Sequence, residues 1–294
     1  MNSIQAMAKL FRRFLSWVWY ARNSIPLLNF PIPWRLPYGG WFLVYPDEMG
    51  LGLIPKRPWN KLSSSYEEGE WRFLLRFIKQ GMVCFDIGAN QGFYTILLSK
   101  QVGTQGKVFA FEPVPGELRK LKRNIRINRC SNVVLEGMAI SSYEGYVDMF
   151  VCLGGHSSRS SLAPPPTEVK APVKVEKVPV ITLDGYIMRN DIKEIHFMKI
   201  DVEGSEREVI KGAEKVVLKE LRPLIMMEMA DVTNLQFGYK AVENYRYLDS
   251  LGFVWFEVTS NGFLKTTSPK ITYRENLIAV PEEKLKMVQR FIKE

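Results

Sequence analysis

Residues 83–95, VCFDIGANQGFYT, decide the fold of this chain. The stretch reads as a short apolar strand that carries Asp86 near its end, a turn that contains Gly88 and Gly92, and the start of a helix. Glycine permits tight backbone turns, and the first turn of a helix presents N–H groups that lack partners. The pattern therefore predicts a turn that accepts a polar or anionic ligand.

Outward from this stretch, β-rich runs alternate with helix-period segments from residue 66 onward. Such alternation predicts an α/β fold, a Rossmann-like doubly wound sheet that is mostly parallel and has helices on both faces. Expected strands are residues 82–87, 107–111, 132–139, 144–152, 173–181, 195–201, 223–229, 252–258 and 275–280. Expected helices are residues 66–80, 92–101, 115–128, 205–220, 239–250 and 282–293. Residues 153–172 are rich in Gly, Ser and Pro, which predicts a long functional or mobile loop.

Composition narrows the class of protein. With 294 residues, of which 46% are hydrophobic, the chain is neither disordered nor collagen-like, and it is long enough to bury a large core. Its three cysteines have neither disulfide-framework nor metal-ligand spacing, which favours a reduced, cytoplasmic setting. The sequence has no run of about 18 uncharged apolar residues, so we expect no membrane span.

The N-terminal region differs from the rest, and we expect a boundary between residues 1–60 and residues 61–294. If residues 5–22 are helical, a broad apolar face that includes Trp17 lies opposite a narrow basic one. This pattern is typical of helices that lie on anionic membranes, which makes the protein a candidate for peripheral membrane binding, and it equally suits a helix docked on its own core or on a second subunit. Residues 26–59 are interrupted by prolines and predict an irregular connector.

Glu112 ends the second expected strand, KVFAF. An acid at this place in a doubly wound sheet can accept hydrogen bonds from both hydroxyls of a ribose. The spacing G-x-x-x-G between Gly88 and Gly92 differs from the G-x-G-x-x-G of pyrophosphate-binding folds, which disfavours NAD or FAD. A nucleoside ligand without pyrophosphate fits these residues better, while a surface acid that merely ends a strand is the plainer interpretation.

Four segments resemble, in order, the motifs of the FkbM-type S-adenosylmethionine-dependent methyltransferases. They are DIGANQGFYT (86–95), FEPVPGELRKLKRNIRIN (111–128), TLDGYI (182–187) and FMKIDVEGSEREVIKGAEKVV (197–217). The resemblance runs from about residue 70 to residue 258, roughly two thirds of the chain. It implies the class I methyltransferase type of sheet, with S-adenosylmethionine as cofactor, and identifies residues 61–294 as a methyltransferase domain.

The resemblance also implies which residues bind the cofactor. The turn would hold the methionine end, Glu112 the ribose, and the stretch after the third strand would border the adenine. The residues so implied are Asp86, Gly88, Asn90, Gly92, Tyr94, Thr95, Glu112, Met138 and Ala139. The usual acceptors of FkbM-type methyltransferases are hydroxyl groups. The resemblance therefore implies O-methylation of a hydroxyl of a sugar, glycolipid or natural product.

An alcohol is a poor nucleophile, so a group must take or polarise its proton. Asp201 and Glu228 follow or end expected strands, where open α/β sheets bind ligands, and either is a candidate catalytic residue or ligand for a divalent cation. Lys199 shares a strand face with Asp201, which predicts an ion pair. His156, in the loop of residues 153–172, is a third catalytic candidate. Carboxylates that only favour the start of the following helix are the alternative.

Two other functions remain as alternatives. One is a non-catalytic membrane or partner adaptor that carries residues 5–22 on a methyltransferase fold. The other is an RNA methyltransferase, suggested by the basic run of residues 119–129. Interleaved Leu and Ile make that run an amphipathic helix with a solvated basic back, which disfavours a nucleic-acid partner. The acceptor and the oligomeric state carry no signal in the sequence.

Overall fold

A computed structural model of the chain describes residues 31–45, 67–153, 160–164 and 172–293. The predictions for residues 5–22 and for His156 therefore lie outside the described residues. Within the described ranges, no helix is both long enough and apolar enough to cross a lipid bilayer.

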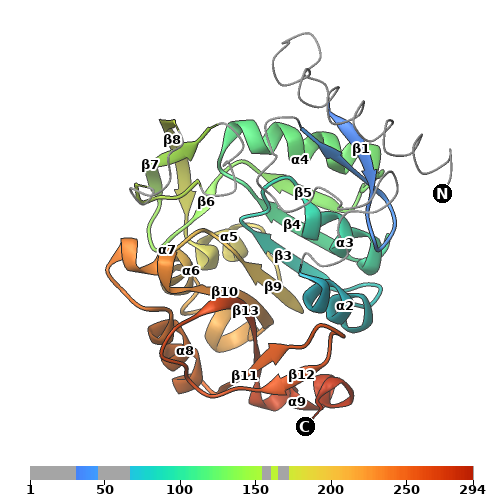
Figure 1. Cartoon of the computed structure of the whole chain (residues 1–294), viewed down its shortest axis with the longest axis vertical. Helices are drawn as coiled ribbons and strands as arrows, with labels where there is room; N and C mark the ends of the chain where they lie inside the picture. The colour runs from blue at the N-terminus through green and yellow to red at the C-terminus, as the bar shows by residue number, and fades with distance from the viewer. Residues whose placement is uncertain (1–30, 46–66, 154–159, 165–171, 294) are drawn as a thin grey trace, which may run out of the picture.

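The core of the molecule is an eight-stranded sheet in the order β12-β11-β13-β10-β9-β3-β4-β5 (Figure 1). The strands are β3 (Val83–Ile87), β4 (Lys107–Phe111), β5 (Val133–Glu136), β9 (Phe197–Ile200), β10 (Leu224–Ala230), β11 (Phe253–Val258), β12 (Leu264–Thr266) and β13 (Arg274–Pro281). The five strands from β5 to β10 pair in parallel, whereas β13, β11 and β12 pair in antiparallel fashion. The chain leaves β3 in one direction toward β5 and later returns on the other side at β9, so the strand order reverses between β3 and β9. Ligands of doubly wound sheets bind at such a reversal.

Helices cover both faces of this sheet, as predicted. Alternate residues of the strands point to opposite layers, so that Cys84, Phe197 and Met226 pack with α2 and α3 while Phe85 and Met198 pack with α5, α6 and α8. The helices are α2 (Glu68–Phe77), α3 (Phe93–Val102), α4 (Pro115–Ile127), α5 (Leu183–Arg189), α6 (Glu206–Gly212), α7 (Asp231–Asn234), α8 (Ala241–Ser250) and α9 (Leu285–Val288). The predicted α/β fold with a mostly parallel sheet is confirmed.

Some boundaries differ from the prediction. The strand expected at residues 132–139 is divided, because β5 ends in the large sheet and β6 (Ala139–Ile140) joins a separate one. This small sheet has the order β6-β8-β7, with β7 (Gly145–Cys152) antiparallel to β8 (Val173–Ile181). The helix expected at residues 205–220 is α6 followed by a π-helical turn, and the one at 282–293 is three short turns. The sequence prediction did not include α5, α7 and β12.

A β-hairpin precedes the large sheet, where the sequence predicted an irregular connector. It pairs β1 (Ile32–Arg35) with β2 (Trp41–Val44) through a turn in which Gly39 and Gly40 have positive φ. Phe42 and Val44 pack against Ile96 of α3. The prolines misled the prediction because Pro33 lies in an edge strand, where a missing N–H breaks no ladder within the sheet.

The outer edge of the hairpin is tied to α4. The Leu43 N–H donates to Asn124 Oδ1 and the Trp41 N–H donates to Asn128 Oδ1, both at 2.8 Å. Asn124 is fully buried, and its amide nitrogen also donates to the Gln91 carbonyl in the turn after β3. The hairpin is therefore fixed to the same helix and turn that border the predicted ligand site.

Candidate active site

A cavity of about 140 Å³ lies at the carboxyl ends of β3, β4 and β9, where the strand order reverses. The structure brings most of the predicted site residues to its wall. The predicted residues that line it are Asp86, Gly88, Asn90, Tyr94, Glu112, Met138, Ala139 and Asp201. Gly92, Thr95 and Glu228 are not among the lining residues. Segments that are far apart in the sequence thus meet at one site.

The turn after β3 is shaped by close backbone approaches. Gly88 has a φ of 82°, and a Cβ atom there would lie 1.8 Å from the Asp201 carbonyl oxygen. The N–H groups of Gly88 and Ala89 both donate to the Phe111 carbonyl, at 3.1 and 2.9 Å. These bonds hold the end of β3 against β4. The close approach of the Asp201 carbonyl leaves room only for glycine at position 88.

Glu112 is held by backbone donors on both carboxylate oxygens. The Asn90 N–H donates to Oε2 and the Val114 N–H donates to Oε1, each at 2.8 Å. Burial raises the pKa of Glu112 to about 8, against the opposing effect of these hydrogen bonds. Each oxygen keeps a second lone pair, so the carboxyl group can still accept a hydrogen bond from a ligand in the cavity.

Asp86 lies deeper, with only 1% of its surface exposed. Thr95 Oγ1 donates to Asp86 Oδ2 at 2.5 Å, whereas Oδ1 is buried and has no hydrogen-bond partner within the described part of the chain. Burial raises the pKa of Asp86, and Lys199 opposes that rise. The Thr95 hydroxyl thus orients the Asp86 carboxylate. A Cβ atom on Gly92 would collide with the Leu121 side chain of α4. Both predicted positions support the wall of the cavity rather than line it.

Lys199 and Asp201 form the predicted ion pair, with Nζ 2.6 Å from Oδ2. Lys199 is 3% exposed, and its ammonium group lies 4.8 Å from the centre of the Tyr94 ring. Burial alone would lower the pKa of Lys199, but Asp201, Asp86 and Glu67 outweigh it and raise the pKa. The lysine is a permanent cation among carboxylates.

Two residues near this pair were not predicted. Glu67, just before α2, accepts a hydrogen bond from the Tyr94 hydroxyl at 2.6 Å and one from the Asn276 side-chain amide at 3.1 Å. Burial raises the pKa of Glu67, and Lys199 opposes that rise. The sequence signal was weak, since Glu67 is one of several acids before a helix and Asn276 is brought near by antiparallel pairing of β13 with β10.

Glu228 lies in β10, directly opposite Asn276. Its Oε2 atom is buried and has no hydrogen-bond partner among the described residues. Burial raises the pKa of Glu228 well above its usual value, and Asp201, Glu203 and Glu206 raise it further. In the described ranges, no three side chains of His, Cys, Asp or Glu are grouped so that they could hold a metal ion.

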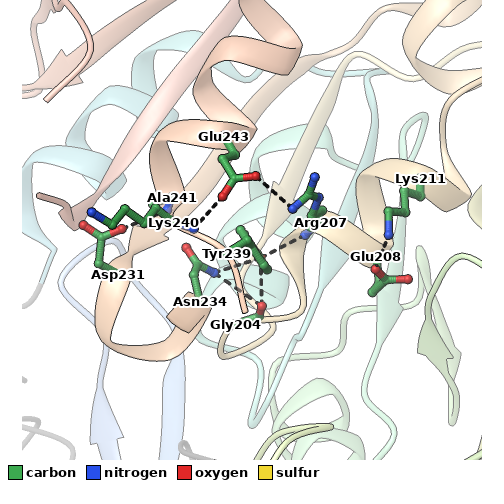
Figure 2. Close-up of polar contacts among 10 residues, drawn as sticks. All are labelled: Gly204, Arg207, Glu208, Lys211, Asp231, Asn234, Tyr239, Lys240, Ala241 and Glu243. Carbon is green, nitrogen blue, oxygen red and sulfur yellow. Dashed lines mark hydrogen bonds and ion pairs between the residues drawn. The ribbon is translucent and has the colours of Figure 1, made fainter. Parts of the chain in front are cut away.

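A hydrogen-bonded network supports the turn between β9 and α6, as Figure 2 shows in part. The Gly204 carbonyl accepts the Tyr239 hydroxyl at 2.8 Å and the Asn234 side-chain amide at 3.3 Å. Glu206 is fully buried, and its Oε1 accepts the N–H groups of Val202 and Gly204, at 3.2 and 3.1 Å. Its Oε2 accepts Asn234 Nδ2 at 2.6 Å. Glu206, which the sequence analysis did not single out, is thus a structural carboxylate near the start of a helix.

Part of the serine-rich loop reaches the cavity. Ser160 lines the cavity, and Ser161 Oγ donates to the Glu203 carbonyl at 2.7 Å. Phe42 of the hairpin also contributes to the wall, which the sequence did not indicate. The small sheet and the hairpin therefore both contribute residues to the wall of this cavity.

The model of the methyltransferase FkbM domain matches residues 86–255, more than half of the chain. The chain belongs to the FkbM methyltransferase family. It therefore carries an S-adenosylmethionine-dependent methyltransferase domain, as the four motifs implied. The matched range of this FkbM domain begins at Asp86 and includes every cavity residue named above except Phe42.

Among curated proteins, the chain is similar to the hexuronic acid methyltransferase AglP of Haloferax volcanii. The two are 27% identical over 151 residues, which cover 50% of this chain and 56% of AglP. The chain thus spans little more than half the length of this curated relative.

Solved structures with a similar arrangement include an O-methyltransferase from Bacillus cereus in complex with S-adenosylhomocysteine. Its TM-score is 0.43 at 15% identity, over 74% of this chain and 83% of that one. Another is the precorrin-6y C5,15-methyltransferase of Geobacter metallireducens, with a TM-score of 0.42 at 13% identity, over 78% and 93% of the two chains.

Proposed function

We propose that this FkbM methyltransferase transfers a methyl group from S-adenosylmethionine to a hydroxyl oxygen of a sugar, glycolipid or natural product. The observation that carries the proposal is one cavity that combines the turn after β3, Glu112 and the Lys199–Asp201 pair. Similarity to a hexuronic acid methyltransferase supports a sugar as acceptor.

The residues of the cavity fit the cofactor. Glu112 retains acceptor capacity toward a ribose diol, and Met138 and Ala139 offer an apolar border for an adenine. Asp86 Oδ1 is a buried acceptor that lacks a partner within the described residues, as a site for a polar or cationic group requires. When bound, S-adenosylmethionine supplies a sulfonium methyl group that an aligned oxygen can attack in line.

Asp201 is the residue best placed to take the proton of the acceptor hydroxyl. It lines the cavity, and Lys199 fixes one of its oxygens at 2.6 Å, leaving the other free to face an acceptor.

The cofactor half of the proposal is tested by titration calorimetry with S-adenosylhomocysteine. Wild type should bind it, and Glu112→Ala should weaken binding about tenfold, since a hydrogen-bonding partner of the ribose hydroxyls is lost. The exposed Glu243→Ala is a matched control and should bind as wild type does. Absence of binding, or equal binding by Glu112→Ala, contradicts the proposal.

The acceptor half is tested by comparing glycan and lipid fractions from host cells with and without the gene. Mass spectrometry should find species that lack the mass of one methylene group when the gene is absent. Purified wild type should restore that mass, while Asp201→Asn should do so at least about 100-fold more slowly and still bind S-adenosylhomocysteine. Equal turnover by Asp201→Asn would remove it from the role of base.

A further inference from the structure

One face of α4 carries an unbroken cationic stripe. Its members recur at the three- and four-residue spacing that aligns side chains along a helix. They are Arg119, Lys122, Arg123, Arg126 and, just past the helix end, Arg129, and all five are exposed. The opposite face of α4 is occupied, because Leu121 packs toward the large sheet and Asn124 and Asn128 hold the hairpin.

These five cations have no carboxylate partner within the described ranges of the chain. The single acid of α4 is Glu117, which is buried and accepts hydrogen bonds from Gln91 and Lys120 instead. Like charges four residues apart, such as Arg119 and Arg123, destabilise a helix by about 0.2–0.5 kcal/mol per pair. The stripe therefore lacks an internal counter-charge and suits an external anionic partner.

Apolar side chains lie beside the charges. Trp41 of the hairpin is 49% exposed and Ile127 at the end of α4 is 39% exposed. Trp41 is tied to α4 because its N–H donates to Asn128 Oδ1 at 2.8 Å and its carbonyl accepts Asn128 Nδ2 at 2.6 Å. Arg35, also exposed, stands opposite Trp41 in the hairpin register. Basic, aromatic and aliphatic groups thus share one surface.

We propose that the exposed face of α4 and the hairpin β1–β2 together dock on an anionic lipid bilayer. Lys and Arg near such a surface are attracted by its negative potential, and Trp is favoured at the headgroup level. A nucleic acid would satisfy the charges but offers no apolar phase for Ile127.

Docking in this way brings the active site to the membrane. The residues Val114 and Glu117, at the start of α4, line the cavity. A bilayer bound along the stripe would therefore lie near the cavity and its acceptor. The inference stands independently of the proposed acceptor, because it needs only the exposed charges and apolar side chains of α4 and the hairpin.

Vesicle flotation of the full chain tests the proposal. Wild type should float with vesicles that contain phosphatidylglycerol and phosphatidylcholine, and should float far less with phosphatidylcholine alone or in high salt. The triple variant Arg119→Gln, Lys122→Gln, Arg126→Gln should bind the anionic vesicles about 100-fold more weakly, since each charge near the surface contributes about fivefold. Thermal unfolding checks that the variant remains folded.

A matched control removes three exposed cations elsewhere. Arg246→Gln, Lys265→Gln and Lys286→Gln lie on α8, β12 and α9, and Figure 1 places these elements at the other end of the molecule from α4. This control should float as wild type does. Flotation of the α4 variant equal to that of the control overturns the proposal, as does equal binding of wild type to neutral and anionic vesicles. Binding of wild type to a single-stranded RNA without flotation assigns the stripe to nucleic acid and also overturns it.

Discussion

Glu206 of α6 and Glu228 of β10 are close enough to interact electrostatically, yet their surroundings differ. Both oxygens of Glu206 accept hydrogen bonds, from two backbone N–H groups and from Asn234. The Oε2 atom of Glu228 is buried without a partner within the described residues. A buried polar atom without a partner costs about 1–3 kcal/mol. The first carboxylate therefore maintains the fold, whereas the second lies near Asp201 of the proposed active site.

The same contrast extends to the neighbouring strands. Asp86 and Lys199 are directly opposite each other in the register of β3 and β9, and both point to the layer of α2 and α3. Asp86 also has one buried oxygen without a partner in the described residues. Each of these two carboxylates of β3 and β10 thus has an oxygen without a partner in the described residues, whereas both oxygens of Glu206 beside them are hydrogen-bonded.

The strongest test of the contrast is Glu206→Ala. It leaves the N–H groups of Val202 and Gly204 without their acceptor and removes one acceptor of the Asn234 amide, so we expect a loss of about 4 kcal/mol in the free energy of unfolding. Urea denaturation measures it. Glu208→Ala is the matched control, because Glu208 is less buried and pairs with Lys211 and Ser142, and about 1 kcal/mol is expected. A loss below 1 kcal/mol for Glu206→Ala would refute its structural role.

Gly88→Ala tests the contact between the turn after β3 and the backbone of Asp201 after β9. The new Cβ would collide with the Asp201 carbonyl, and the positive φ adds strain, so we expect a loss of about 3 kcal/mol and weaker binding of S-adenosylhomocysteine. Gly116→Ala is the control, since nothing lies within 4 Å of its added Cβ, and it should change stability by less than about 1 kcal/mol. Equal effects of the two alanines would show that the backbone approach at Gly88 is loose.

Glu228→Gln should increase the free energy of unfolding rather than lower it. The pKa of Glu228 is raised well above 4.5, so the folded chain keeps a proton that the unfolded chain releases. Wild-type stability therefore falls as pH rises from about 4.5 toward the raised pKa, while Glu228→Gln lacks this dependence. We expect the variant to gain about 1–2 kcal/mol over wild type at pH 8 and almost nothing at pH 4. Denaturation at the two pH values measures it, and a constant difference would contradict the raised pKa.

The smallest effect is expected at the exposed edge of the network around Glu206. Glu243 forms an exposed ion pair with Arg207, with Oε2 and Nη1 3.0 Å apart (Figure 2). Exposed pairs contribute about 0.2–1 kcal/mol, so Glu243→Ala should change the unfolding free energy by no more than that. Thermal unfolding in low and high salt measures the pair. A loss like that of Glu206→Ala would mean that the whole network, rather than its buried part, supports the turn.

Much of the fold could be predicted because local and global signals agree. The strand, glycine turn and helix of residues 83–95 lie close to where the pattern placed them, and the Lys199–Asp201 pair follows from strand alternation. The small sheet could not be predicted, because a short strand at residues 139–140 is indistinguishable in sequence from a continuation of β5. The hairpin was hidden by its prolines.

The site was predicted where one segment supplies both a motif and its geometry. Asp86 and Glu112 meet at the cavity because parallel strands end at the same edge of the sheet. Glu67 and Asn276 were missed because they approach through a helix start and an antiparallel strand, which no local spacing reveals. Glu206 was visible only as an acid near a helix, and its role depends on Asn234 and Tyr239 from a later part of the chain.

The position of Phe42 has a practical consequence for anyone who seeks the smallest active fragment. Phe42 forms part of the cavity wall, and the hairpin that carries it is fixed by Asn124 and Asn128. Trimming the protein to the matched range of residues 86–255 would open that wall and also remove most of β3. A working truncation must therefore begin ahead of the hairpin.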